Sequence, residues 1–169
     1  MWGWAGRDMV AIMNEALELA PGQKVLEVGA GSGWHAATVA EVVAPLNAPK
    51  EEWGHVWTIE IVPELALMAR KNIEANGFAD RVTVLHGDGS MGYPPEAPFD
   101  RILVTAAAPD VPAPLVEQLA DGGILLVPVG GLHLFQSLLK VRKVRGEVHV
   151  QDLGGVAFVP LRGKYGHRA

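Results

Sequence analysis

Apolar and polar positions follow two different periods along this chain. Short apolar runs, typical of buried strands, cover residues 24–28, 56–61, 82–86, 101–105 and 124–128. Between these runs, apolar residues recur at helical spacing, which predicts helices over 7–19, over 34–43, from Pro63 to a cap at Gly77, and near 114–119. The helix after Pro63 is expected to bury one stripe, formed by Leu65, Met68, Ala69 and Ile73.

Beyond residue 128 the helical spacing stops. Residues 136–145 and 149–158, joined by a turn at Gly146, predict an antiparallel hairpin. Strands that alternate with helices predict a mostly parallel twisted sheet with helices on both faces, and the hairpin adds antiparallel strands at one edge. The fold class is therefore α/β. Because no linker or repeat interrupts the pattern, residues 1–169 are expected to form one domain.

Composition and charge narrow the function classes. The chain has 169 residues, 49% of them hydrophobic, and a formal net charge of -5, so neither a nucleic-acid partner nor a membrane is expected. The basic residues Lys140, Arg142, Lys143 and Arg145 alternate with valines, which predicts the solvated face of a strand. The chain has no cysteine, and its six histidines show no ligand-like pairing, so we expect a cytoplasmic protein without disulfides or a metal site.

A glycine-rich loop follows the first predicted strand. The loop is Gly29-Ala30-Gly31-Ser32-Gly33, and the helix pattern begins directly after it. A buried strand that stops at glycines and opens a helix leaves backbone N–H groups free at the helix start. This arrangement predicts a cradle for a polar or anionic small molecule, and a tight turn without a ligand is the alternative.

Acidic residues stand at the ends of the neighbouring strands. In an open α/β sheet the ligand lies beyond the carboxyl ends of the strands, near the point where the strand order reverses. Glu60 ends the second strand, and its carboxylate is expected to accept two ribose hydroxyls. Asp88, followed by Gly89, comes after the third strand and is expected to accept from an adenine amino group. Glu27, inside the first strand, suits a cationic amino group or holds the loop.

A dinucleotide remains a rival ligand at this point. Gly31, Gly33 and Ala36 fit the dinucleotide fingerprint. Against it, the chain has no second mononucleotide-binding half that would take a nicotinamide.

Several motifs in order resemble the protein-L-isoaspartate (D-aspartate) O-methyltransferase family. Residues 24–37 (KVLEVGAGSGWHAA) resemble the first motif of that family. Residues 86–93 (HGDGSMGY), followed by 97–100 (APFD) and 106–109 (AAAP), resemble the second. Residues 122–130 (GGILLVPVG) resemble the third. The tail, residues 158–166 (FVPLRGKYG), is distinctive of this family among methyltransferases.

The resemblance implies a class I S-adenosylmethionine-dependent methyltransferase, with a Rossmann-like fold. The cofactor is then S-adenosyl-L-methionine, with S-adenosyl-L-homocysteine as product, and the substrate is the carboxylate of L-isoaspartyl or D-aspartyl residues in damaged proteins. Partners are isoaspartyl-containing peptides and proteins, and the chain is expected as a monomer or weak homodimer.

The resemblance also assigns residues to the ligand. Residues 29–33 would hold the methionine part of the cofactor. Glu60 and Ile61 would hold the ribose and flank the adenine, and Asp88 and Gly89 would bind the adenine. Arg162 and His167 fall where the tail of the family approaches the cofactor or the substrate.

The N-terminus departs from the family pattern. Members carry a longer N-terminal segment with a motif of the type Gly-Gln-Thr-Ile-Ser-x-Pro, whose serine is assigned a catalytic or positioning role. Alignment on residues 9–11 puts Ala5 at that serine, so the segment is expected to be truncated or missing and the catalytic residue is unknown. Two alternatives stay open: a class I methyltransferase of another substrate, and a catalytically impaired paralogue that binds the cofactor.

Overall fold

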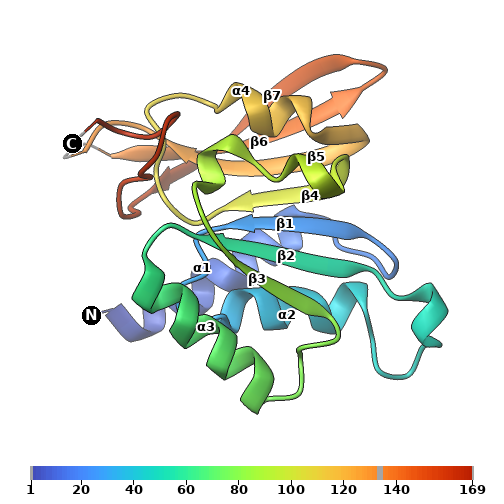
Figure 1. Cartoon of the computed structure of the whole chain (residues 1–169). Coiled ribbons are helices and arrows are strands. Elements are labelled where there is room, and N and C mark those ends of the chain that lie inside the picture. Colours follow the sequence, from blue (N-terminus) through green and yellow to red (C-terminus); the bar gives the residue numbers. More distant parts are fainter. Residues whose placement is uncertain (1, 133–134, 169) are drawn as a thin grey trace.

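The computed structural model describes residues 2–132 and 135–168, with side chains from Asp8 onward. One seven-stranded sheet, ordered β3-β2-β1-β4-β5-β6-β7, runs through the described part of the chain (Figure 1). Its strands are β1 (Lys24–Val28), β2 (His55–Glu60), β3 (Val82–His86), β4 (Phe99–Val104), β5 (Leu119–Val129), β6 (Gln136–Val144) and β7 (Glu147–Val156).

The strand directions match the predicted sheet. β1 pairs in parallel with β2 on one side and with β4 on the other, β2 with β3, and β4 with β5. β5–β6 and β6–β7 are antiparallel, which is the predicted terminal hairpin at one edge. The strand order therefore reverses between β1 and β4, and a ligand crevice is expected beyond the carboxyl ends of these two strands.

Helices cover both faces of the sheet. α1 (Trp2–Ala16), α2 (Trp34–Val43) and α3 (Pro63–Ala75) lie on one face, and the short α4 (Ala113–Glu117) lies on the other (Figure 1). Three 3₁₀ turns, η1 (Lys50–Glu52), η2 (Gly89–Met91) and η3 (Pro94–Glu96), complete the described elements. Met13, Leu17 and Ile73 belong to the core on the first face, whereas Leu115 and Leu161 belong to the core on the second.

Helix α1 differs from its predicted range of 7–19. It begins earlier and ends at Ala16, and Glu18 adopts a left-handed backbone conformation with φ of 53°. Lys140 and Arg142 from β6 both donate to the Glu18 carboxylate, so a distant strand holds the point where this helix ends. The predicted solvated face is therefore wrong for Lys140, whose side chain is only 14% exposed.

Helix α3 buries a narrower stripe than predicted. Its buried residues are Ala66, Ala69 and Ile73, whereas Leu65 and Met68 are 38% and 39% exposed. Two of the three buried positions are therefore filled by small alanine side chains, and Leu65 and Met68 lie beside the buried stripe. None of the described helices is both long enough and apolar enough to span a bilayer.

Candidate functional site

The glycine loop is pinned at the point where the strand order reverses. Gly29 N–H donates to the Ile59 carbonyl of β2 at 2.8 Å, and Thr105, after β4, donates its hydroxyl to the Gly29 carbonyl at 2.8 Å. A Cβ on Gly29 would overlap the Thr105 side chain, and the φ of 101° at Gly29 also favours glycine. The loop is thus held from both sides by the strands that flank β1.

Glu60 faces the same loop. Its Oε1 accepts from Gly31 N–H at 3.1 Å and its Oε2 accepts from Val62 N–H at 3.2 Å. The side chain is buried, with the residue 7% exposed. Since each carboxylate oxygen accepts two hydrogen bonds, one acceptor position stays available on each oxygen for a ligand. The N–H of Gly31, which was expected to be free for a ligand, is therefore bound by Glu60, the residue expected to bind the ribose.

Two cavities adjoin at the loop, and both are lined by Gly29, Gly31 and Thr105. The first cavity, of about 420 Å³, is also lined by Val28, Ile59, Glu60, Ile61, Val62, Leu65, Gly89, Ala106, Val159, Pro160, Leu161 and Arg162. The second cavity, of about 560 Å³, is also lined by Met9, Val10, Met13, Ala30, Ser32, Trp34, His35 and Phe158. Because the two cavities share these lining residues, one elongated ligand could occupy both of them.

Leu65 and Gly89 show how these walls arise. Leu65, which lies outside the core, lines the first cavity. A Cβ on Gly89 would come within 2.6 Å of the Val28 side chain, so only glycine lets this turn approach β1 so closely.

Asp88, predicted as an adenine acceptor, binds backbone and side-chain donors of the chain itself. Its Oδ1 accepts from Ser90 N–H at 3.0 Å and from Ser90 Oγ–H at 2.6 Å. Its Oδ2 accepts from Lys164 N–H, in the tail, at 2.8 Å. Contact of Asp88 with adenine stays a prediction, and the neighbouring Gly89 is the residue of this pair that lines the first cavity.

Glu27, two positions before the loop, is fully buried. Thr58 Oγ–H donates to its Oε1 at 2.6 Å, whereas Oε2 has no hydrogen-bond partner among the described residues. Burial, opposed by the Thr58 hydrogen bond, raises the pKa of Glu27 to about 8. The carboxyl group is therefore largely protonated at neutral pH. This position suits the second expected role, support of the loop.

His35 connects Glu27 to helix α1. Its Nδ1 lies 3.8 Å from Glu27 Oε2, and its Nε2 lies 2.8 Å from Asn14 Oδ1. The orientation of the Asn14 amide follows from Thr38. The Thr38 hydroxyl donates to the His35 carbonyl, so it accepts from Asn14 Nδ2, and Asn14 Oδ1 is left facing His35. Nε2 of His35 therefore carries the proton. Burial lowers the pKa of His35 to about 4, so the contact with Glu27 joins two neutral groups at pH 7.

Sequence reasoning missed Asn14, Thr58 and Thr105 as parts of this site. A signal for Asn14 was present, since it lies next to Met13 and three positions before Leu17 on the buried stripe of its helix. A polar residue beside such a stripe needs a hydrogen-bond partner in the core.

The tail and the N-terminus account for the remaining predicted residues. Arg162 lines the first cavity, and the Nε2 of His167 is buried without a hydrogen-bond partner among the described residues. Ala5 lies in α1, but its side chain is outside the described residues. Among the described residues, no group of three or more His, Cys, Asp or Glu side chains is placed to hold a metal ion.

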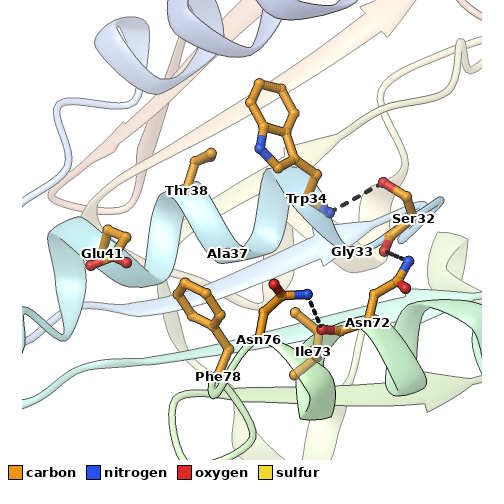
Figure 2. Close-up of a pocket in the computed structure, with 10 residues that line it drawn as sticks. All are labelled: Ser32, Gly33, Trp34, Ala37, Thr38, Glu41, Asn72, Ile73, Asn76 and Phe78. Carbon is orange, nitrogen blue, oxygen red and sulfur yellow. Dashed lines mark hydrogen bonds between the residues drawn. The ribbon is translucent and has the colours of Figure 1, made fainter.

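A groove of about 370 Å³ lies between α2 and α3 (Figure 2). Asn72 Nδ2 donates to the Ser32 carbonyl at 2.9 Å, and Asn76 Nδ2 donates to the Asn72 carbonyl at 2.8 Å. Trp34 lines both this groove and the second cavity and is 50% exposed. Of the predicted ligand residues the groove has only Ser32 and Gly33, so the two loop cavities are the better candidate site.

Comparison with known proteins identifies the family. The family model described as protein-L-isoaspartate(D-aspartate) O-methyltransferase matches residues 5–166. The chain belongs to this family.

Sequence relatives and solved structures agree with the family assignment. The protein-L-isoaspartate O-methyltransferase of Hyperthermus butylicus is 56% identical over 160 residues, which cover 95% of this chain and 66% of the relative. A solved protein-L-isoaspartate O-methyltransferase superposes with a TM-score of 0.83 at 30% identity, over 94% of this chain and 48% of the other. The present chain thus spans about two thirds of that sequence relative and about half of that solved chain.

A second solved structure has a ligand. It is a Plasmodium falciparum beta-aspartate methyltransferase in complex with S-adenosyl-L-homocysteine, with a TM-score of 0.76 and 25% identity over 90% of this chain and 71% of the other. With these neighbours, the predicted class I methyltransferase fold of the Rossmann-like type is confirmed.

Proposed function

We propose that this chain is an S-adenosylmethionine-dependent O-methyltransferase that acts on the carboxylate of L-isoaspartyl or D-aspartyl residues in damaged proteins. One observation carries the proposal: two cavities meet at the glycine loop beside the buried Glu60, in a chain that matches the family over residues 5–166. Such a pair of cavities suits a ligand with an adenosyl group at one end and an amino acid at the other.

The cofactor residues follow from the two cavities. Glu60 accepts the ribose hydroxyls, and Ile61 and Gly89 flank the adenine in the first cavity. The backbone of Gly29, Ala30, Gly31 and Ser32, which line the second cavity, holds the methionine part, together with the neighbouring Gly33, which lines neither cavity. Two further predicted residues lie outside the cavities: Glu27 supports the loop through Thr58 and His35, and Asp88 stays the predicted partner of the adenine amino group.

When bound, the cofactor supplies a sulfonium methyl group that is already electrophilic. An isoaspartyl carboxylate is ionised at neutral pH, so the chain needs no strong base. The residues that line the second cavity instead align the carboxylate oxygen with the methyl carbon and sulfur and exclude water. Such alignment is worth several kcal/mol, and in favourable cases about 7–11 kcal/mol.

A second candidate is a catalytically impaired paralogue that binds the cofactor without transferring its methyl group. Ala5 favours this alternative, because it stands where the family motif has its serine. Against it, loss of one positioning donor costs on the order of 10²-fold where such donors matter most, so this loss alone would weaken transfer rather than abolish it.

Methylation of paired peptides tests the proposal. We expect base-labile methyl incorporation into a peptide with L-isoaspartate and none into the same peptide with normal aspartate. Calorimetry with S-adenosyl-L-homocysteine separates the candidates: binding without transfer favours the impaired paralogue, and absence of binding contradicts both. The cytoplasmic location and the monomeric or weakly dimeric state stay predictions.

A further inference from the structure

The C-terminal tail forms a wall of the first cavity. Ala107 N–H, just beyond β4, donates to the Val159 carbonyl at 2.7 Å, and Leu161 N–H donates back to the Ala107 carbonyl at 2.8 Å. Residues 159–162 of this segment line the first cavity. The shape of that cavity therefore depends on where the tail is held.

Asp88 and Ser90 fasten the next residues of the tail. Asp88 Oδ2 accepts from Lys164 N–H at 2.8 Å, and Ser90 Oγ accepts from Tyr165 N–H at 3.1 Å. Ser90 is fully buried, and its hydroxyl donates to Asp88 Oδ1 at 2.6 Å. Two consecutive backbone N–H groups of the tail are thus bound by one Asp–Ser unit at the end of β3.

Gly163 lets the tail pass directly over this unit. Its φ of 121° lies in the region that favours glycine, and a Cβ on it would overlap the Asp88 carboxylate. Of about four acceptor positions on a carboxylate, three of those of Asp88 are used by Ser90 and Lys164. The side chain is therefore mainly committed to contacts within the chain.

We propose that Asp88 is a positioning residue that anchors the tail and thereby sets the wall of the cavity for the adenosyl group. The proposal rests on the proposed function for the identity of that ligand. It assigns Asp88 an effect on cofactor affinity that is exerted through residues 159–162.

Two glycine variants separate anchoring from direct contact. Gly163→Ala adds a methyl group against the Asp88 carboxylate and leaves the carboxylate itself in place. Gly154→Ala is the matched control, because Gly154 has a similar φ of 114° and no atom lies within 4 Å of its added Cβ. We expect Gly163→Ala to bind S-adenosyl-L-homocysteine about tenfold more weakly, and Gly154→Ala to bind it as the wild type does.

A probe on the tail gives a readout without ligand. The chain has no cysteine, so Lys164→Cys provides one attachment site for a spin label. Gly163→Ala and Asp88→Asn should each increase the mobility of this label, whereas Gly154→Ala should not. Asp88→Asn keeps the test available if Gly163→Ala does not fold, because circular dichroism reports folding for each variant.

Each outcome bears on the proposal. Unchanged affinity and unchanged label mobility in Gly163→Ala would overturn it. Unchanged affinity in Gly163→Ala together with weaker binding in Asp88→Asn would mean that Asp88 acts by direct contact. If the wild type does not bind S-adenosyl-L-homocysteine, the proposed function fails, while label mobility still decides whether Asp88 anchors the tail.

Discussion

Glu60 is the residue on which cofactor affinity should depend most. Its carboxylate is buried beside the glycine loop and retains one acceptor position on each oxygen. Glu60→Gln removes the charge that strengthens both hydrogen bonds from ribose. We expect binding of S-adenosyl-L-homocysteine to weaken by about 10- to 100-fold, since hydrogen bonds to charged groups contribute about 1.5–3 kcal/mol.

Isothermal titration calorimetry measures this change. Glu64→Gln is the matched control, because Glu64 is an exposed acid in the first turn of α3. Equal affinity for the Glu60 and Glu64 variants would contradict the role assigned to Glu60.

Glu27 should make stability depend on pH above neutrality. Its native pKa of about 8 exceeds the ordinary value of 4.5, so its contribution is fully present below pH 4.5 and is lost as pH rises through 8. The pKa of His35 is lowered to about 4, so His35 raises the free energy of unfolding as the pH rises from 4 to 6.5. Among the described residues with a shifted pKa, Glu27 is the one that titrates from pH 6.5 to 8, and we expect the free energy of unfolding to fall by about 1–2 kcal/mol over this range.

Urea denaturation at several pH values tests this prediction. Glu27→Gln cannot ionise and keeps an acceptor for Thr58, so its free energy of unfolding should stay level over this range. Glu64→Gln should keep the slope of the wild type. A slope in Glu27→Gln equal to that of the wild type would show that Glu27 does not titrate there.

At the scale of elements, Gly33 lies at the close contact between the start of α2 and α3. It has a φ of 89°, and a Cβ on it would lie 3.3 Å from the Ala69 carbonyl oxygen and from Ile73 Cγ1 in α3. Gly77 has a φ of 78° with no atom within 4 Å of an added Cβ. Both alanine variants force a left-handed conformation, at about 1–2 kcal/mol, but only Gly33→Ala also pushes the helices apart.

Denaturant unfolding compares the two variants. We expect Gly33→Ala to cost about 1–3 kcal/mol more than Gly77→Ala, the usual penalty for overpacking. Equal costs would mean that the space between α2 and α3 accommodates a methyl group.

Elements with local signals were predicted best. β1, α2 and β3 have their predicted bounds, because an apolar run or a helical period ends at glycines or at a turn in each case. The end of α1 could not be predicted, since Lys140 and Arg142 fasten Glu18 from more than 120 positions away. β5 is longer than expected because Leu119 pairs with Phe99 before the register shift.

The site residues likewise divide into those with a local sequence signal and those whose contacts depend on distant parts of the chain. The glycine loop, Glu60, Ile61 and Gly89 follow strand ends, and these positions meet at the cavities. Asp88 also follows a strand end, but its contact with the tail depends on residues 76 positions away. Thr58 acts through a tertiary contact that no local pattern contains, and the local signal at Asn14 did not reveal its partner His35.

For the whole molecule, ligand binding should raise the stability of the fold. The cavities are built from β1, β2, α1, α3 and the tail, so a bound ligand links segments that are far apart in the chain. At a concentration 100 times its Kd, S-adenosyl-L-homocysteine should add about 2.7 kcal/mol to the free energy of unfolding. Thermal unfolding with methionine at the same concentration is the control, because methionine lacks the adenosyl group. An equal effect of both compounds would contradict an adenosyl site.

The central claim is that one adenosyl group lies in the first cavity, beside the glycine loop and with its ribose against Glu60. The crystal structure of the chain in complex with S-adenosyl-L-homocysteine tests it most directly. The predicted result has the ribose hydroxyls within hydrogen-bond distance of the Glu60 carboxylate, the adenine beside Ile61 and Gly89, and the amino-acid part along residues 29–33. Adenine density in the groove between α2 and α3, or a ribose remote from Glu60, would contradict the account.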